Sequence, residues 1–260
     1  MHRFALFVDG SNLVGVLRRM GVQVDDYEKF YRFIFDSAVD TWRTTSTAIS
    51  PPPAQLFRVN WYEVGSVDDW DLADPDAQAT LRSAFDRDDE IKRTYMALAG
   101  QKLPGKPQSE VATEAWNMCS GEFRKWYEQR VDLVAGFRRF HHSIRARTDF
   151  IDVIECGHWK VDLLHRTVQE KGLDTRLAVD MVTTLENYDV ALLLSGDADN
   201  IPAIEHVKAR GRHVGVVEFL GGYPPEKKGG AFSSRLKITA DFVVRVYEME
   251  LVTKGLGSKT

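Results

Sequence analysis

The sequence predicts an α/β protein with a mostly parallel sheet flanked by helices, and two observations support this fold class. Residues 3–9 contain the continuous apolar run 4–8, and residues 190–194 form another; such short runs are typical of strands buried on both faces. Between such runs, the apolar residues recur at helical spacing. Strands that alternate with helices form parallel sheets through right-handed crossovers. In such sheets, ligands bind outside the carboxyl ends of the strands.

The elements after the first strand follow from local patterns. Ser11 or Asn12 is expected to cap a helix that runs to about Arg19. Residues 25–45 are expected to form a second helix, because their apolar side chains recur at helical spacing. Residues 55–64 are rich in aromatic and branched residues, which predicts a strand.

Residues 66–148 depart from this alternation. Their first part is acidic, and residues 76–99 and 110–146 carry helical patterns. We interpret 66–148 as a helical insertion in a single domain that spans residues 1–260. Residues 221–260 are interpreted as a C-terminal extension.

The alternation of strands and helices resumes at Phe150. Asp174 is expected to cap a helix from Thr175 to about Glu186, and Gly172 and Gly211 are expected to end helices. The remaining elements are predicted from their apolar patterns as strands at 150–156, 189–195, 212–219 and 240–247, helices at 160–171 and 200–210, and a loop at 221–230.

The composition is that of an ordinary globular protein. Hydrophobic residues make up 43% of the 260 residues, and charged residues make up 28%. No apolar run approaches the ~20 residues that cross a bilayer, and Cys119 and Cys156 lack a metal-binding spacing. We therefore expect a cytoplasmic protein with reduced thiols. The formal net charge of −4 disfavours non-specific binding to nucleic acid.

Carboxylates follow two of the predicted strands. Asp9 ends the first strand, and Asp197 and Asp199 follow the strand at 189–195. Adjacent strand ends of a parallel sheet lie roughly 5 Å apart, and clustered carboxylates repel one another unless a cation joins them. Oxygen ligands suit Mg²⁺ or Mn²⁺. This pattern predicts metal-dependent phosphodiester chemistry.

Each of these acids also has a purely structural interpretation. Asp9 precedes a glycine, and Asp-Gly is a common turn pair. Asp199 stands just before a proline-containing helix start and can cap that helix. Asp180 lies on the flank of a helical apolar stripe, where a carboxylate can overlook a cleft or simply face solvent.

Three motifs occur in a fixed order along the chain. They are Phe7-Val8-Asp9-Gly10-Ser11-Asn12, then Lys171-Gly172-Leu173-Asp174 running into Leu177-Ala178-Val179-Asp180-Met181-Val182, and finally Leu194-Ser195-Gly196-Asp197-Ala198-Asp199. Together they resemble the motifs of the NYN domain family, the PIN-like nuclease branch that includes LabA-like proteins. The resemblance covers residues 3–13 and about 150–219, and it leaves residues 66–148 unexplained.

The resemblance implies a Rossmann-like PIN fold and a Mg²⁺- or Mn²⁺-dependent ribonuclease, in which endonuclease action is expected. By position, Asp9, Asp180 and Asp197 would bind the metal, Asp199 would be an auxiliary acid, and Asn12 would assist by hydrogen bonding. The residues expected to contact the substrate are Ser11, Lys171, Ser195, Arg138 and Arg139. One departure from many relatives is Asn200, where an aromatic or apolar residue is common.

The resemblance implies RNA as the partner, with tRNA or another structured RNA among the candidates. A homodimer or a regulatory protein partner is also compatible with the sequence. The basic segment at 137–148, with Arg138, Arg139, His141 and His142, can follow an RNA backbone or can be a solvated surface. Two other functions stay open: a catalytically silent RNA- or protein-binding module, and a metal-dependent small-molecule phosphohydrolase.

Overall fold

The structure, a computed structural model, describes residues 1–45, 53–225, 228–229 and 232–259. It divides into two compact units. The first, here called the sheet unit, comprises Met1–Val64, Arg139–Gly157 and Gly172–Thr260. The second, here called the helical unit, comprises Gly65–Arg138 and His158–Lys171.

The sheet is mostly parallel, as predicted. Its strand order is β5-β4-β3-β1-β6-β7-β8, and β9 also pairs with β7. The parallel strands lie in the order β3-β1-β6-β7-β9, which is the 2-1-3-4-5 order of doubly wound folds. Their bounds are β1 His2–Asp9, β3 Ala54–Val67, β6 Val190–Leu194, β7 His213–Gly221 and β9 Phe242–Tyr247.

The order of the parallel strands changes direction between β1 and β6. The chain runs from β1 to β3 on one side and then returns to β6 on the other side of β1. In open α/β sheets, such a switch point leaves a crevice at the carboxyl ends of the two strands. The two predicted acidic motifs stand at the carboxyl ends of β1 and β6.

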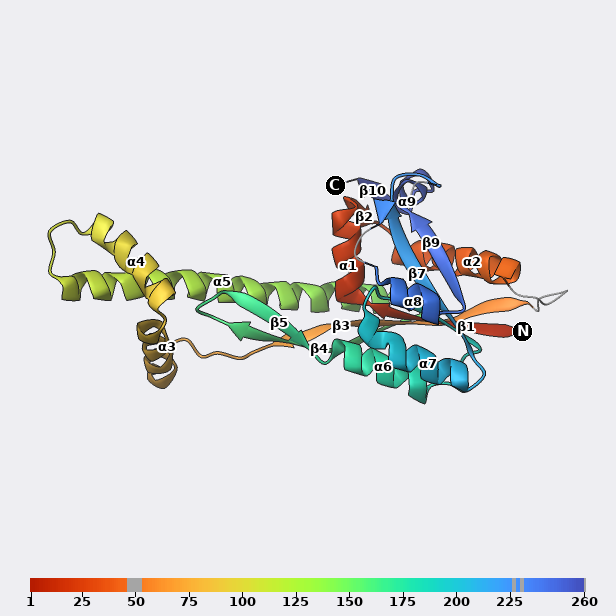
Figure 1. The fold of residues 1–260 in the computed structure, drawn as a ribbon, viewed down its shortest axis with the longest axis horizontal. Helices are drawn as coiled ribbons and strands as arrows, with labels where there is room; N and C mark the ends of the chain where they lie inside the picture. Colours follow the sequence, from red (N-terminus) through yellow and green to blue (C-terminus); the bar gives the residue numbers. More distant parts are fainter. Residues whose placement is uncertain (46–52, 226–227, 230–231, 260) are drawn as a thin grey trace. The chain divides into compact units, whose positions relative to one another are not determined.

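The first strand is buried on both faces, as its continuous apolar run predicts. Phe4, Leu6 and Val8 pack into one hydrophobic cluster, while Ala5 and Phe7 pack into another. Helices cover these two faces of the sheet unit (Figure 1). The first face carries α1 Gly10–Arg19, α2 Tyr27–Thr45 and α9 Glu248–Thr253; the second carries α6 Leu173–Thr183, α7 Ile201–Ala209 and α8 Ser234–Thr239.

Three helix starts differ from the predictions. Asp9 caps α1 through its side chain, so the helix begins at Gly10 and neither Ser11 nor Asn12 is its cap. The α6 helix begins at Leu173, because Gly172 takes up a left-handed φ of 87° immediately before it. Asp174 therefore lies inside the first turn of α6.

The third difference concerns Asp199. Asp197 accepts the Asp199 N–H and caps the short 3-10 helix Ala198–Asn200, labelled η1. Asn200 then stands before α7 and makes no side-chain capping bond. Asp199 is thus not the helix cap, which leaves its side chain exposed at the carboxyl end of the sheet.

The C-terminal region adds elements that the sequence patterns did not predict. β2 (Val22–Val24) pairs antiparallel with β10 (Gly257–Lys259) in a separate two-stranded sheet. β8 (Lys228–Gly229) pairs with the end of β7. Short strands of two or three residues carry too little apolar periodicity to be recognised from sequence.

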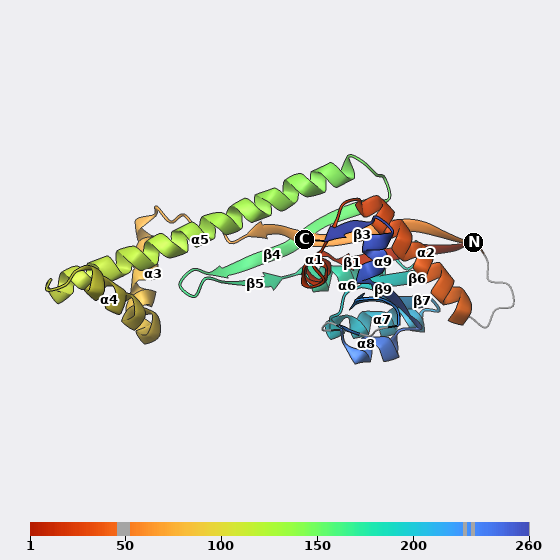
Figure 2. The same ribbon diagram turned by 90° about the horizontal axis from the view of Figure 1, so that it is seen from above.

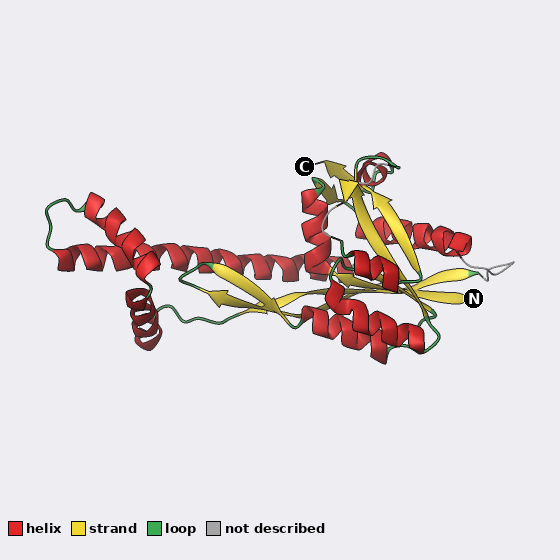
Figure 3. Ribbon diagram, in the orientation of Figure 1, coloured by secondary structure: helices red, strands yellow, loops and turns green. Residues whose placement is uncertain are grey.

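The helical unit contains three helices, and the last of them continues into the residues of the sheet unit. Figure 3 draws the helices in red. They are α3 Pro75–Arg87, α4 Asp89–Lys102 and α5 Gln108–Arg145, of which residues 108–138 belong to this unit. The expected helix at 76–99 is broken because Asp88 leaves the helical conformation and caps α4 by accepting the Ile91 N–H. A hydrophobic cluster that includes Phe85 and Phe123 holds these helices together.

The helix predicted at 160–171 was wrong. β4 (Ile151–Asp162) and β5 (Thr167–Lys171) pair antiparallel there, with His158 opposite Lys171 (Figure 2). The turn between them passes through Arg166, whose φ is 51°. Of the helices described, none is long and apolar enough to cross a membrane.

Candidate functional site

Asp9 is the buried centre of the candidate site. It ends β1, and only 5% of its surface is exposed. One oxygen, Oδ1, accepts the Asn12 N–H at 2.8 Å, and Oδ2 accepts the Ser195 hydroxyl at 3.1 Å. Hydrogen bonds to a carboxylate are shorter and stronger than neutral ones. The turn after β1 and the turn after β6 are therefore fixed to the same carboxylate.

Further hydrogen bonds join these two turns. The Asn12 Oδ1 atom accepts the Gly196 N–H at 3.3 Å. The Ser195 Oγ atom accepts the Asp197 N–H at 3.2 Å, and Asp197 Oδ1 accepts the Asp199 N–H at 3.0 Å. The structure thus brings together five of the predicted residues: Asp9, Asn12, Ser195, Asp197 and Asp199.

Asp180 lies on α6, which packs against β1 and η1. The Arg176 Nε atom is 2.9 Å from Asp180 Oδ2, and the Tyr62 hydroxyl donates to the same oxygen at 3.1 Å. Tyr62 is the β3 residue paired with Asp9 in the sheet register. Asp180 is therefore linked to the strand beside Asp9, through Tyr62, and does not stand alone in solvent.

Two pKa shifts describe the surroundings of Asp180. Burial, with the negative charge of Asp180 in addition, raises the pKa of Tyr62 far above its usual value, so its hydroxyl remains a donor. The hydrogen bond to Asp180 and its charge raise the pKa of Arg176. Asp180 is accordingly held by one neutral donor and one permanent cation.

The carboxylates of Asp9, Asp180 and Asp197 can be compared with the ligands that a divalent cation requires. Their oxygen donors fit Mg²⁺ or Mn²⁺, and Asp9 and Asp197 would hold such an ion between the ends of β1 and β6. Within the described residues, no group of three or more His, Cys, Asp or Glu side chains is arranged to bind a metal. Asp180 is paired with Arg176 in this structure.

Glu63 is a buried acid that the sequence analysis did not single out. It lies near the end of β3 and is 5% exposed. The Nε2 atom of His141 is 4.0 Å from Glu63 Oε1, and its Nδ1 atom is 3.9 Å from Glu155 Oε1. Burial lowers the pKa of His141, an effect that Glu155 opposes and Arg145 supports. In the sequence, Glu63 could have been recognised as an acidic residue within a strand rich in aromatic residues.

The sequence analysis also did not identify the side chains that contact Asp180. Arg176 and Asp180 are four residues apart on one helix, a spacing at which ion pairs form, so the pair was visible in the sequence. Tyr62 carried no such signal, because a tyrosine in an apolar strand is usually part of the core. Its hydroxyl became a site feature only through the packing of α6 on the sheet.

The hydrogen bonds described above involve none of the remaining predicted residues. Arg138 belongs to the helical unit, where it donates to the Gly65 carbonyl at 2.5 Å. Lys171 ends β5 in the same unit. Ser11 lies in the first turn of α1 and Arg139 on α5, and both are exposed. His141, expected on a basic surface, is 1% exposed, which corrects that prediction.

The fold defines a doubly wound α/β protein with carboxylates at the switch point of its parallel sheet. Residues 123–241 match the NYN domain family, whose fold is PIN-like. This match confirms the resemblance drawn from the three motifs. The matched range includes Asp180, Ser195 and Asp197, while Asp9 lies outside it. NYN domains are typically nucleases or RNA-binding domains.

Two individual proteins are similar to this chain. The low amplitude and bright protein LabA of Synechococcus elongatus (strain ATCC 33912 / PCC 7942 / FACHB-805) is 42% identical over 57 residues. That stretch is 22% of this chain and 31% of LabA, so the chain spans about a third of that relative. A crystal structure of VPA0982, a protein of unknown function from Vibrio parahaemolyticus RIMD 2210633, aligns with a TM-score of 0.42 and 14% identity. It covers 94% of this chain and 93% of the other.

Proposed function

We propose that this protein is a metal-dependent ribonuclease that cleaves RNA at the carboxyl edge of its sheet, as an endonuclease. The observation that supports this most is the hydrogen-bonded series from Asp9 through Ser195 to Asp197, which stands at the switch point of the sheet. Burial of a carboxylate costs free energy unless it is hydrogen-bonded or paired with a cation, and Asp9 accepts hydrogen bonds from the Asn12 N–H and the Ser195 hydroxyl. The typical activities of NYN domains supply the expectation of RNA chemistry.

Each residue has a distinct part in this proposal. Asp9 is oriented by the Asn12 N–H and the Ser195 hydroxyl, so that it can hold a divalent cation together with Asp197. When bound, Mg²⁺ or Mn²⁺ supplies electrostatic stabilisation of the charge that develops on the scissile phosphate. Asp199, which is exposed beside Asp197, would accept the proton of the attacking water.

Cleavage of labelled single-stranded RNA tests this function. The wild type is incubated with Mg²⁺, with Mn²⁺ and with EDTA, and compared with the Asp9→Asn and Asp197→Asn variants. Asp40→Asn, which changes an exposed acid on α2 by the same atoms, is the matched control. We expect cleavage only with metal, lost in the two site variants and retained in the control. Full turnover by folded Asp9→Asn would remove Asp9 from the mechanism.

A circular RNA substrate tests the endonuclease part separately. A circle has no ends, so only internal cleavage produces linear molecules. Linear products from the circle would support endonuclease action. Degradation of linear RNA with an intact circle would instead establish an exonuclease.

The ion pair of Asp180 favours a second candidate, the catalytically silent RNA-binding module. Arg176 neutralises the carboxylate that would otherwise complete the acidic site. Retained RNA binding without cleavage, in the presence of either metal, would establish this second function in place of the first.

A further inference from the structure

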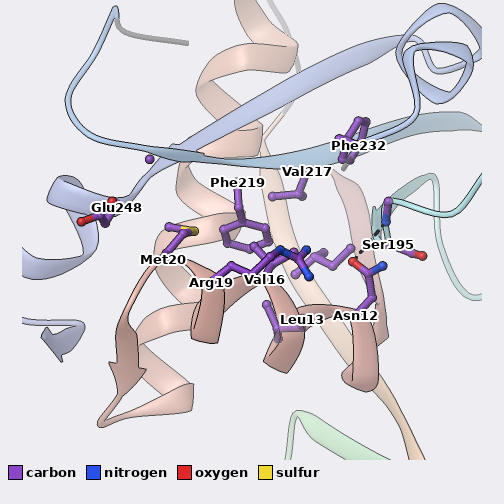
Figure 4. A pocket seen from close by; sticks show the side chains of 13 residues that line it. Asn12, Leu13, Val16, Arg19, Met20, Ser195, Val217, Phe219, Phe232 and Glu248 are labelled. Atoms are coloured by element: carbon purple, nitrogen blue, oxygen red, sulfur yellow. Dashed lines mark hydrogen bonds between the residues drawn. The ribbon is translucent and has the colours of Figure 1, made fainter. Parts of the chain in front are cut away.

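A pocket opens directly beside the candidate site, between α1 and the carboxyl ends of β6 and β7 (Figure 4). Its volume is about 260 Å³. Pockets for drug-sized ligands run to roughly 300–1,000 Å³, so this one suits a single flat ring system better than a larger molecule. Its lining residues come only from the sheet unit.

The walls of the pocket are largely apolar and include an aromatic ring. Val16, Met20 and Val217 line it together with Phe219, whose ring is stacked with that of Phe30, with centroids 6.3 Å apart and an interplanar angle of 6°. That stacking holds the Phe219 ring in place, and Figure 4 shows the ring at the centre of the lining. A fixed aromatic ring in an apolar pocket is a platform on which a nucleobase can stack.

The polar groups of the pocket are mainly hydrogen-bond donors. Asn12 uses its Oδ1 atom to accept the Gly196 N–H, which turns its Nδ2 amide to other partners. Arg19 is exposed in the last turn of α1 and lines the pocket. Glu248 is an acceptor, but it is already engaged by the Gly222 N–H and by Lys259. A ligand with acceptor atoms at its edge would therefore find partners here.

The pocket and the candidate site share residues. Asn12 and Ser195 both line the pocket, and both donate hydrogen bonds to Asp9. A ring held in the pocket would thus lie next to the carboxylates proposed to act on a phosphate. A purely aliphatic ligand would form hydrogen bonds with neither the Asn12 amide nor the Arg19 guanidinium, and it would gain nothing from the nearby carboxylates.

We infer that this pocket binds one nucleobase of the RNA substrate, stacked on Phe219, and that it favours guanine over adenine. The inference rests on the proposed function. Guanine presents two acceptors, N7 and O6, on one edge, which an arginine such as Arg19 recognises, whereas adenine presents a donor beside N7. The pocket selects the nucleotide next to the cleaved bond, which is a source of sequence preference for the nuclease.

Binding of mononucleotides in EDTA tests the pocket without requiring cleavage. Calorimetry would compare GMP, AMP and ribose 5-phosphate on the wild type, and then GMP on Arg19→Ala and Phe219→Leu. Arg18→Ala, one position earlier on α1 and exposed, is the matched control. We expect GMP to bind best and each pocket variant to weaken GMP by about ten-fold, as loss of one stacked or hydrogen-bonded partner does. Arg18→Ala should bind GMP as the wild type does.

Other outcomes would overturn the inference. Equal binding of ribose 5-phosphate and GMP would show a phosphate site without a base pocket. If the protein cleaves RNA but does not bind GMP, the pocket is not a base-binding site, while the proposed nuclease function is retained. GMP that binds but does not compete with an RNA oligonucleotide would assign the pocket to a free nucleotide. Circular dichroism and melting of each variant exclude unfolding as the cause.

A mapping experiment connects the pocket to cleavage. Sequencing of product ends should place a guanine at a constant position beside the cut in the wild type. Among the cuts that Arg19→Ala still makes, the guanine preference should be weaker than in the wild type. Cut sites without any base preference in the wild type would contradict the role given to the pocket.

Discussion

The α-carbon of Gly10 lies against the carboxylate of Glu63. A Cβ atom at Gly10 would stand 2.2 Å from Glu63 Oε1 and 2.5 Å from the Trp61 Nε1 atom. Both distances are far shorter than real contacts allow. Packing therefore requires glycine after Asp9, because β3 brings two large side chains against the first residue of α1.

Gly10→Ala should destabilise the protein for this reason. Overpacking of this kind costs about 1–3 kcal/mol, and neither Glu63 nor Trp61 can withdraw easily because both are buried. Gly15→Ala on the same helix is the control, since its nearest neighbour would be Arg19 Nη1 at an ordinary 3.6 Å. That change should be neutral or should stabilise by up to about 1 kcal/mol through helix propensity. Thermal and urea unfolding of both variants measure the difference, and equal stabilities would contradict the packing argument.

Arg176→Ala should strengthen metal binding at the candidate site. Without the guanidinium, the Asp180 carboxylate keeps only the Tyr62 hydroxyl as a described side-chain partner and becomes available to a cation. Half-exposed ion pairs are worth about 0.2–1 kcal/mol, so we expect Mn²⁺ affinity to rise by about two- to five-fold. Calorimetry or the electron paramagnetic resonance signal of free Mn²⁺ measures this without any cleavage.

Arg210→Ala is the matched control for that experiment. It removes one exposed arginine from the end of α7, so the change in net charge is the same. An equal gain in Mn²⁺ affinity in both variants would show a general charge effect. Unchanged affinity in Arg176→Ala would show that Asp180 takes no part in holding the ion.

Asp189 should make the stability of the sheet unit depend on pH. Burial alone would raise its pKa, but the Arg3 N–H, the Arg3 guanidinium and Arg212 outweigh burial and hold the pKa below 3.8. A carboxyl whose folded pKa is depressed stabilises the fold above its unfolded pKa, and this contribution is lost as pH falls through the folded pKa. The wild type should therefore lose stability below about pH 4.

The Asp189→Asn variant isolates this contribution. We expect it to be less stable than the wild type at neutral pH by about 1–3 kcal/mol, because it weakens the hydrogen bonds to Arg3 and Arg212. The gap should close as pH falls, since the wild-type side chain becomes neutral too. Urea unfolding at several pH values measures the gap, and a gap that stays constant into acid would rule out the linkage.

Much of the sheet unit was predictable because its strands are buried on both faces. Continuous apolar runs identified β1 and β6, and the acids that end them were visible without any knowledge of strand order. The strand order itself was not predictable, because register and neighbour choice depend on packing between distant segments. The switch point between β1 and β6, which explains why Asp9 and Asp197 meet, emerged only from the fold.

The errors have local physical reasons. At 160–171 the apolar residues Val161, Leu163 and Val168 fit helical and strand patterns alike. The segment forms the end of β4, a turn and β5, and the pairing of Val161 with Val168 joins the two strands. At the starts of α1 and η1, more than one side chain could cap the helix. Asp9 caps α1 and also accepts the Ser195 hydroxyl, whereas Asp197 caps η1 by accepting the Asp199 N–H. Glu63 was not identified from the sequence because its partner His141 is distant along the chain.

Tyr62 and Asp180 offer a test of how β3 positions the acid of α6. Tyr62→Phe removes only the hydroxyl that donates to Asp180 Oδ2. A double-mutant cycle with Asp180→Ala should give a coupling free energy of about 1–2 kcal/mol, since the acceptor is charged. The raised pKa of Tyr62 keeps its hydroxyl protonated, so the coupling should not change between about pH 6 and pH 9. A coupling near zero would mean that Arg176 alone holds Asp180, and that the sheet does not set its position.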